Sequence, residues 1–114
     1  MDLAGQGLAG IAGSGMISLV IIVEAAEGKA EMFLKYITEE ASEVIAHEPG
    51  CRDFLVSRSR ENPNVFTLAE FYDDGAALEA HRQTSHFILF QERVREFGLI
   101  ADRTAVPGDV VFPM

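Results

Sequence analysis

The stretch VFTLAEFYDDGAALEAHRQTSHF, residues 65–87, combines a strand, an acidic turn and the start of a helical segment. Residues 65–72 are rich in aromatic and β-branched side chains and predict a strand. Asp73-Asp74-Gly75 predicts the cap of a short helix at residues 76–82, because an Asp side chain accepts hydrogen bonds from the free N–H groups of a first helical turn. This unit carries two of the three histidines of the chain, so it is the expected location of any chemistry.

The segments on either side supply the other elements. The predicted elements are strands at residues 17–23, 53–58, 65–72 and 100–106 and helices at residues 28–47, 76–82 and 86–97. Their order, with the last two helices taken as one helical segment, is β-α-β-β-α-β. This order predicts an α+β, ferredoxin-like fold with an antiparallel sheet, in one domain at residues 16–106.

The long helix has an apolar stripe at spacings of three and four residues. The stripe consists of Ala30, Phe33, Leu34, Ile37, Ala41, Val44 and Ile45. Glu39, Glu40 and Glu43 are expected to lie off this stripe. Pro49-Gly50 ends the helix.

The sheet is expected to form a homodimer, which would make a dimeric α/β-barrel. Strands 17–23 and 65–72 are apolar on both faces, while the helices of this fold cover only one face. A second copy of the sheet is the simplest cover for the other face. Pro107-Gly108 is expected to break the chain, and the apolar tail at residues 107–114 is expected to pack on the partner subunit. Residues 1–15, rich in Gly and Ala, are interpreted as a flexible leader or an artificial extension.

Composition excludes several classes of partner. The net charge of −9 argues against nucleic acid and against an anionic membrane, because both reward clustered Lys and Arg. No apolar run is long enough to span a membrane. The single cysteine, Cys51, excludes an internal disulfide and suggests a reducing, cytoplasmic setting.

Four polar residues of the opening stretch are candidates for chemistry: Glu70, Tyr72, His81 and His86. Leu78 must face the core, and His81 lies one helical turn further on, so His81 is expected to point inward toward Glu70. A neutral histidine can accept a proton near pH 7. Structural roles remain open for all four, including an ion pair of Glu70 with Arg58 or Arg103. His81 and His86 are five residues apart across a helix break, so no metal site is expected.

These residues resemble the antibiotic biosynthesis monooxygenase (ABM) family over about residues 16–103. The resemblance is carried by Glu48-Pro49-Gly50-Cys51, Phe54, Val56, Asn62-Pro63, Phe66, Leu68, Glu70-Phe71-Tyr72, Ala77-Leu78, His81, Thr84 and His86-Phe87. It implies a dimeric α/β-barrel and, in the quinol and anthrone monooxygenases of the family, catalysis without metal, flavin or haem. The implied partners are an aromatic or quinol substrate and O2.

The resemblance also implies roles for particular residues. His81, Glu70 and Tyr72 are the implied catalytic group, with His81 as proton acceptor. The implied substrate-binding residues are His86, Phe66, Leu68, Phe33, Phe87 and Phe90.

The family also includes proteins with other activities. The resemblance implies that haem-degrading members use a Trp on the third strand, an Asn on the first strand and a His ligand on the last helix. Haem degradation is disfavoured for this chain, because it has no Trp, no Asn in strand 17–23 and no His in residues 87–91. Two alternatives stay open: an isomerase acting on a small enolisable ketone, and a non-catalytic dimer that binds a small molecule.

Overall fold

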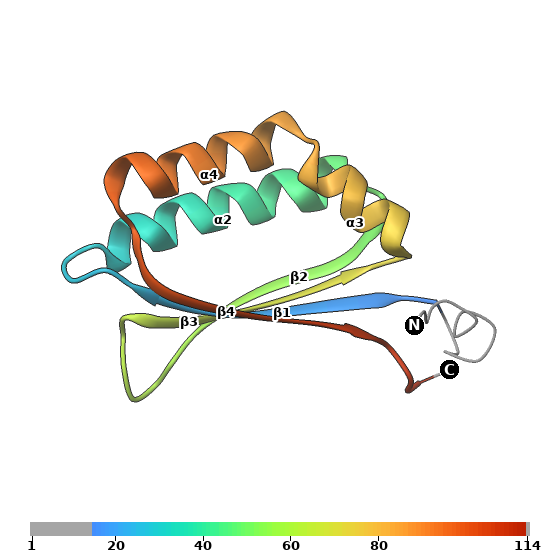
Figure 1. Ribbon diagram of the computed structural model, residues 1–114, viewed down its shortest axis with the longest axis horizontal. Helices are drawn as coiled ribbons and strands as arrows, with labels where there is room; N and C mark the ends of the chain where they lie inside the picture. Colours follow the sequence, from blue (N-terminus) through green and yellow to red (C-terminus); the bar gives the residue numbers. More distant parts are fainter. Residues whose placement is uncertain (1–14, 114) are drawn as a thin grey trace.

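The sheet has all its helices on one face, as the computed structural model of residues 15–113 shows (Figure 1). The elements are β1 (Ile17–Ala25), α2 (Ala30–His47), β2 (Cys51–Arg58), β3 (Val65–Tyr72), α3 (Gly75–Arg82), α4 (Ser85–Phe97) and β4 (Ile100–Asp109). The strands are antiparallel in the order β2-β3-β1-β4. This confirms the α+β ferredoxin-like prediction, whereas the dimer stays a prediction. Residues 1–14 of the interpreted leader lie outside the described residues.

β4 continues further than the sequence predicts. Pro107 pairs with Leu19 and Gly108 with Ser18, so the expected break at Pro107-Gly108 is wrong. β4 is an edge strand, where proline can be accommodated because its missing N–H need not face a neighbouring strand. A Cβ on Gly108 would lie 3.1 Å from Ser18 Oγ, so a residue without a side chain suits this position.

Pairing register decides which side chains of the sheet face the helices. Phe54 lies opposite Glu70, and Val56 lies opposite Leu68. Residues directly opposite in a ladder share a face, so these β2 side chains point to the helix side with Glu70. The other face carries Val20, Ile22, Leu55, Phe71 and Val106, of which Ile22, Leu55 and Val106 are exposed.

Helix α2 packs closely on the sheet. Its buried residues are Ala30, Phe33, Ile37, Glu40 and Val44. The expectation that Glu40 lies off the stripe is therefore wrong: position 40 is three residues after Ile37 and four before Val44, which is the same face of a helix. Ile45, expected in the stripe, is 59% exposed.

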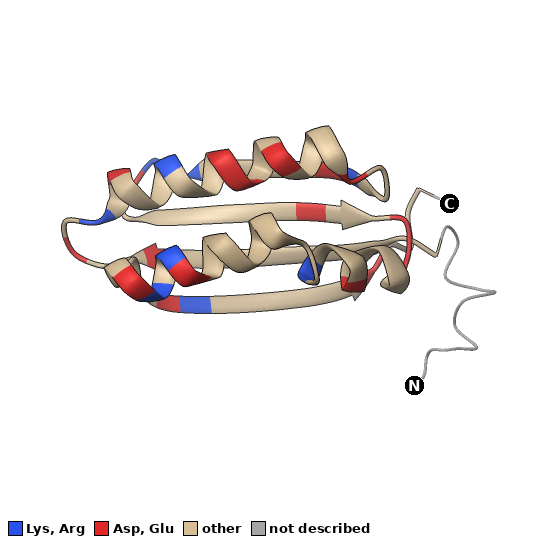
Figure 2. Ribbon diagram, turned by 90° about the horizontal axis from the view of Figure 1, so that it is seen from above, with Lys and Arg blue, Asp and Glu red and all other residues tan. Residues whose placement is uncertain are grey.

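Helix α4 covers the sheet less closely. Thr84 caps its first turn by accepting a hydrogen bond from Phe87 N, and Gly98 ends it with a φ of 58°. None of its residues is fully buried, although Phe90, Val94 and Phe97 touch the core. Figure 2 shows α4 and α2 side by side above the sheet, with acidic residues along α2. Space is thus left under α4.

The short helix α3 depends on a close approach to the segment that begins β2. Asp74 caps α3 by accepting from Ala77 N. A Cβ on Gly50 would lie 2.8 Å from the Cβ of Ala77, closer than real Cβ atoms approach. Glycine at position 50 therefore lets α3 lie against the turn between α2 and β2.

We expect Gly50→Ala to lower the free energy of unfolding by about 1–3 kcal/mol, the usual cost of overpacking, because neither Cβ can rotate away. Gly75→Ala is the matched control, since nothing lies within 4 Å of a Cβ there. Urea denaturation of both variants checks this. A Gly50→Ala protein as stable as Gly75→Ala would contradict the close approach.

Candidate active site

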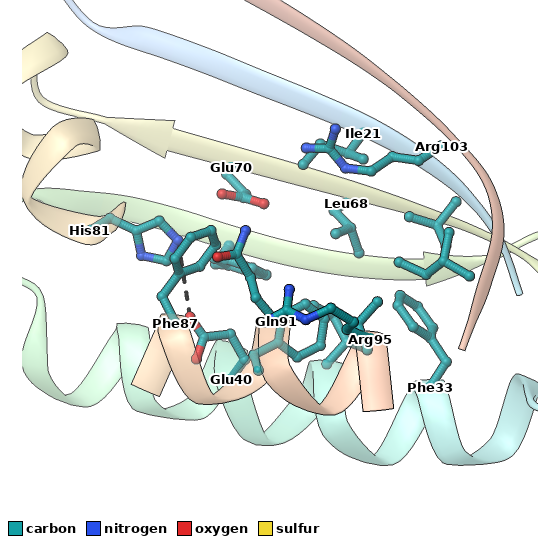
Figure 3. A pocket seen from close by; sticks show the side chains of 16 residues that line it. Ile21, Phe33, Glu40, Leu68, Glu70, His81, Phe87, Gln91, Arg95 and Arg103 are labelled. Atoms are coloured by element: carbon teal, nitrogen blue, oxygen red, sulfur yellow. Dashed lines mark ion pairs between the residues drawn. The ribbon is translucent and has the colours of Figure 1, made fainter. Parts of the chain in front are cut away.

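A cavity of about 460 Å³ lies between the sheet and helices α2 and α4 (Figure 3). It occupies the space that α4 leaves above the sheet. Its lining residues are Ile21, Val23, Phe33, Ile37, Glu40, Phe54, Leu68, Glu70, His81, Phe87, Phe90, Gln91, Val94, Arg95, Ile100 and Arg103. Most are apolar, with a small number of polar groups, which is the composition of a small-molecule site.

His81 is held at one end of this cavity by rings and by a carboxylate. Its side chain is 4% exposed, and the ring centroids of Phe87 and Tyr72 lie 4.7 Å and 5.5 Å from its own. Its Nδ1 lies 3.0 Å and 3.1 Å from the two carboxylate oxygens of Glu48. A carboxylate only accepts, so Nδ1 carries the hydrogen and a neutral ring keeps Nε2 as its free acceptor. Nε2 is the nitrogen available to a ligand.

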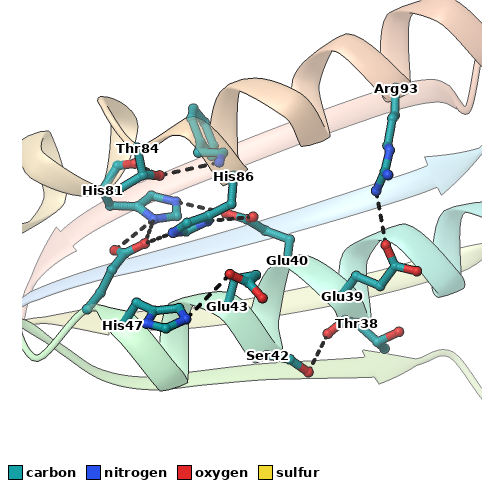
Figure 4. Close-up of polar contacts among 12 residues, drawn as sticks. Thr38, Glu39, Glu40, Ser42, Glu43, His47, His81, Thr84, His86 and Arg93 are labelled. Atoms are coloured by element: carbon teal, nitrogen blue, oxygen red, sulfur yellow. Dashed lines mark hydrogen bonds and ion pairs between the residues drawn. The ribbon is translucent and has the colours of Figure 1, made fainter.

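A cluster of four side chains includes this contact: Glu40 and His81 are buried, and Glu48 and His86 are partly buried. Figure 4 shows Glu40, His81 and His86 of this cluster. Nδ1 of His86 lies 2.8 Å from Glu40 Oε1, and its Nε2 lies 2.9 Å from Glu48 Oε2. His81 Nε2 lies 4.0 Å from Glu40 Oε2. Glu40 lies within α2, Glu48 is the C-cap of α2, and the histidines belong to α3 and α4, so the cluster ties three helices together.

Two atoms of the cluster keep unused hydrogen-bonding capacity. The contact of His86 Nε2 with Glu48 is short but poorly aligned, so this nitrogen has no hydrogen-bond partner among the described residues. Glu40 Oε2 is likewise buried without a partner there. Unpaired buried polar atoms are costly, and in native proteins they frequently mark functional positions.

The cluster reaches a second hollow on the outside of the helix layer. This groove of about 700 Å³ lies between α2 and α4, and both Glu40 and His86 line it. Glu40 also lines the inner cavity. The Glu40–His86 pair therefore stands between the inner cavity and the outer groove.

Glu70 and Tyr72 form a second buried polar pair, on β3. The Tyr72 hydroxyl donates to Glu70 Oε1 at 2.6 Å. Burial raises the pKa of Glu70, partly offset by the Tyr72 hydrogen bond and the charge of His81. Burial, followed by the neighbouring Glu70 charge, also raises the pKa of Tyr72, so its hydroxyl stays a donor. Burial raises the pKa of Cys51 to about 11, which leaves it a thiol at neutral pH.

The structure brings some sequence-predicted site residues to the cavity and leaves others outside it. Those that line it are His81, Glu70, Leu68, Phe33, Phe87 and Phe90. Tyr72 and Phe66 are fully buried outside the lining, and His86 lines the outer groove instead.

Two residues of the site, Glu40 and Glu48, were missed as functional residues. Glu40 had a signal in the sequence, because a carboxylate occupied a position of the buried helical face. Glu48 had none beyond its place before Pro49-Gly50, because its contact with His81 spans 33 residues of the chain.

The proposed partners of Glu70 are also resolved. Arg58 pairs with Glu31 at 2.7 Å and donates to the carbonyl oxygen of Pro63, away from Glu70. Arg103 reaches into the cavity from β4, opposite Arg95 and Gln91 of α4 (Figure 3). No ion pair joins Arg95 or Arg103 to another residue within positions 15–113.

Over the described part of the chain, no group of three or more His, Cys, Asp or Glu side chains is arranged to hold a metal ion. No helix there is long and apolar enough to cross a membrane.

Comparison with known proteins gives one consistent family. The sequence model described as antibiotic biosynthesis monooxygenase matches residues 16–93. A solved structure from Caulobacter crescentus, provisionally named an antibiotic biosynthesis monooxygenase, is 26% identical with a TM-score of 0.80, over 93% of this chain and 99% of its own. One from Nitrosomonas europaea with the same provisional name is 24% identical with a TM-score of 0.80, over 89% and 95%. A comparison with curated protein sequences found no match.

We expect Glu70→Gln to raise the free energy of unfolding at pH 8 relative to the unsubstituted protein. The raised pKa means that Glu70 stabilises the fold most below the ordinary Glu pKa of 4.5, and that this contribution is lost as the pH rises through the raised value. Gln stays neutral and can still accept from Tyr72, so its advantage should be smaller at pH 5.

Urea denaturation at both pH values measures this. Glu61→Gln, at an exposed turn position, controls for the loss of one negative charge. A Glu70→Gln protein that is no more stable than the unsubstituted protein at pH 8 would show that burial of this carboxylate carries no cost.

Proposed function

The chain belongs to the antibiotic biosynthesis monooxygenase family, and we propose that it oxidises a quinol or polyphenol-type molecule with O2, with His81 as the proton acceptor. The observation that carries this proposal is the orientation of His81. Glu48 fixes Nδ1, while Nε2 is left at the closed end of a largely apolar cavity.

The pairing of His81 with Glu48 is suited to general base catalysis. A histidine works as a base only when its acceptor nitrogen faces the substrate and the ring is held in place. The Glu48 carboxylate fixes the ring and stabilises the imidazolium that forms, which is the role of the acidic member in a catalytic triad. The rings of Phe87 and Tyr72 restrict the imidazole further.

In the proposed reaction the substrate supplies all the electrons that reduce O2. His81 takes a proton from an aromatic hydroxyl, and the resulting phenolate is electron-rich enough to pass one electron to O2. Recombination of the two radicals forms a C–O bond, and loss of water then leaves a new carbonyl group. One oxygen atom enters the product and the other leaves as water. Written for the keto tautomer of the substrate, a CH2 group and O2 give C=O and H2O, so the reaction balances without an external reductant.

Glu40 and His86 of the cluster give the abstracted proton a route to solvent. Glu40 Oε2 lies 4.0 Å from His81 Nε2, and Glu40 Oε1 contacts His86, which lines the outer groove. A proton passing from His81 through Glu40 to His86 reaches solvent without recrossing the cavity. Glu70, whose pKa is raised by burial, is placed in this proposal as a hydrogen-bond partner of the substrate beside His81.

We expect oxygen uptake with anthrones or hydroquinones above the uncatalysed rate, measured with an oxygen electrode. His81→Gln should lower kcat by about 10²–10⁴-fold, the usual contribution of a general base. Glu48→Gln should lower kcat less and shift its pH profile, because the base remains but loses its orienting carboxylate. His47→Gln, whose side chain is exposed on α2, is the matched control and should keep full activity.

Uptake that survives unchanged in His81→Gln would remove this residue from the mechanism. Deuterium incorporation from solvent into an enolisable ketone, without oxygen consumption, would point to the isomerase alternative. Tight binding with neither reaction would point to a binding protein.

We also propose that the protein is a homodimer formed by the open faces of two sheets. Ile22, Leu55 and Val106 are 48–58% exposed on that face, which no helix covers (Figure 1). Exposed apolar patches of this kind are typical of protein–protein contacts. The tail packing expected at residues 107–114 stays a prediction: Val111 and Phe112 are exposed, and Met114 lies outside the described residues.

We expect sedimentation equilibrium to give a dimer for the unsubstituted protein and a monomer for Ile22→Lys, because a lysine at the centre of the open face would be buried without a partner in the dimer. Ile88→Lys is the matched control, since Ile88 is 45% exposed on α4, on the opposite side of the molecule. A monomer at micromolar concentration before any substitution would contradict the dimer.

A further inference from the structure

The cavity has two chemically different ends. The closed end holds Glu40, Glu70 and His81, each no more than 4% exposed. The other end holds Arg95 of α4 and Arg103 of β4, both exposed, while Gln91 of α4 lies between the two ends. Apolar side chains lie along the cavity: Leu68 is between the two ends, and Phe33 is beside the arginine end (Figure 3). A ligand that fills the cavity therefore meets an acid–base group at one end and cationic groups at the other.

Arg95 and Arg103 are set apart from most arginines of the chain by their lack of partners. Ion pairs hold Arg52, Arg58, Arg82 and Arg93. Arg60, Arg95 and Arg103 have none within residues 15–113. Two of these three unpaired guanidinium groups line the same cavity, although the protein carries a net charge of −9.

Arg103 is not ion-paired with Glu70. The two side chains form no ion pair within 4.0 Å, and Arg103 affects the pKa of Glu70 less than burial, Tyr72, His81 or Glu40 does. Both guanidinium groups thus keep their donors free, and guanidinium matches the geometry of carboxylate and phosphate oxygens.

We infer that the natural ligand of this cavity is an aromatic hydroxy compound with an anionic substituent, a carboxylate or a phosphate, bound between Arg95 and Arg103. Its ring system occupies the apolar middle, and its hydroxyl group reaches His81. The inference rests on the proposed function for the role of the hydroxyl end, whereas the anion site depends on the two arginines alone.

Binding of matched probes tests this without requiring turnover. Isothermal titration calorimetry compares 2-naphthol, which is neutral, with 6-hydroxy-2-naphthoate, which has its hydroxyl and carboxylate at opposite ends. The naphthoate should bind at least about tenfold more tightly, the gain expected from one charge-assisted hydrogen bond. This preference should shrink as salt is raised, because the guanidinium groups are at the exposed end. Naphthyl phosphate in place of the naphthoate distinguishes phosphate from carboxylate as the preferred group.

Variants assign the preference to the two arginines. The double variant Arg95→Gln/Arg103→Gln should bind the naphthoate about as weakly as 2-naphthol and leave 2-naphthol binding unchanged. Arg60→Gln is the matched control, because Arg60 is also exposed and unpaired but lies in the β2–β3 connection. Circular dichroism and thermal unfolding verify that each variant is folded.

Equal affinity for the neutral and anionic probes, no binding of either probe, or a preference that persists in the double variant would overturn the anion site. Oxygen uptake is read separately. An anion preference without oxygen uptake would leave the site in place and contradict the proposed oxidation. His81-dependent oxygen uptake without an anion preference would support the proposed oxidation and contradict the anion site.

Discussion

The helix layer is held together by the contacts of two glutamates, one within α2 and one at its C-cap, with two histidines of α3 and α4. Helix α4 has no fully buried residue, so apolar contact with the sheet alone fixes it poorly. The Glu40–His86 contact at 2.8 Å and the Glu48–His81 contact at 3.0 Å anchor α4 and α3 to α2. Removing one partner of such a buried pair commonly costs about 3–5 kcal/mol, because the remaining group is left buried without compensation.

The same arrangement explains why a cavity and a base occur together. Anchoring α4 through polar groups at its start leaves space under the rest of the helix, and this space is the cavity. His81 is at its closed end because α3 lies against the turn between α2 and β2, where Gly50 permits the close approach to Ala77. The candidate catalytic base therefore belongs to the same cluster that holds the helices together. Because Glu48 already accepts a hydrogen bond from the Nδ1 of His81, this buried base needs little rearrangement to accept a proton.

Much of this fold could be predicted from the sequence because its signals are local. The aromatic and β-branched residues 65–72 predicted β3, and the cap residue Asp74 marked the start of α3. The inward orientation expected for His81 followed from its position one turn after Leu78. The predictions failed where the position in the sheet, or a contact with a distant part of the chain, overrode a local rule. Pro107 is accommodated because β4 lies at the sheet edge, and Glu40 is buried because its carboxylate finds His86 on a helix 46 residues away.

By itself, the sequence determined the element order, the inward orientation of His81 and the family, since these depend on periodicity, capping and short motifs that neighbouring residues carry. Only the tertiary structure decided which polar groups meet. The contacts of Glu48 with His81, and the convergence of Arg95 and Arg103 on one cavity, join segments that no periodicity relates. Charged groups acquire their roles from partners brought close by packing, and packing is set by the whole chain.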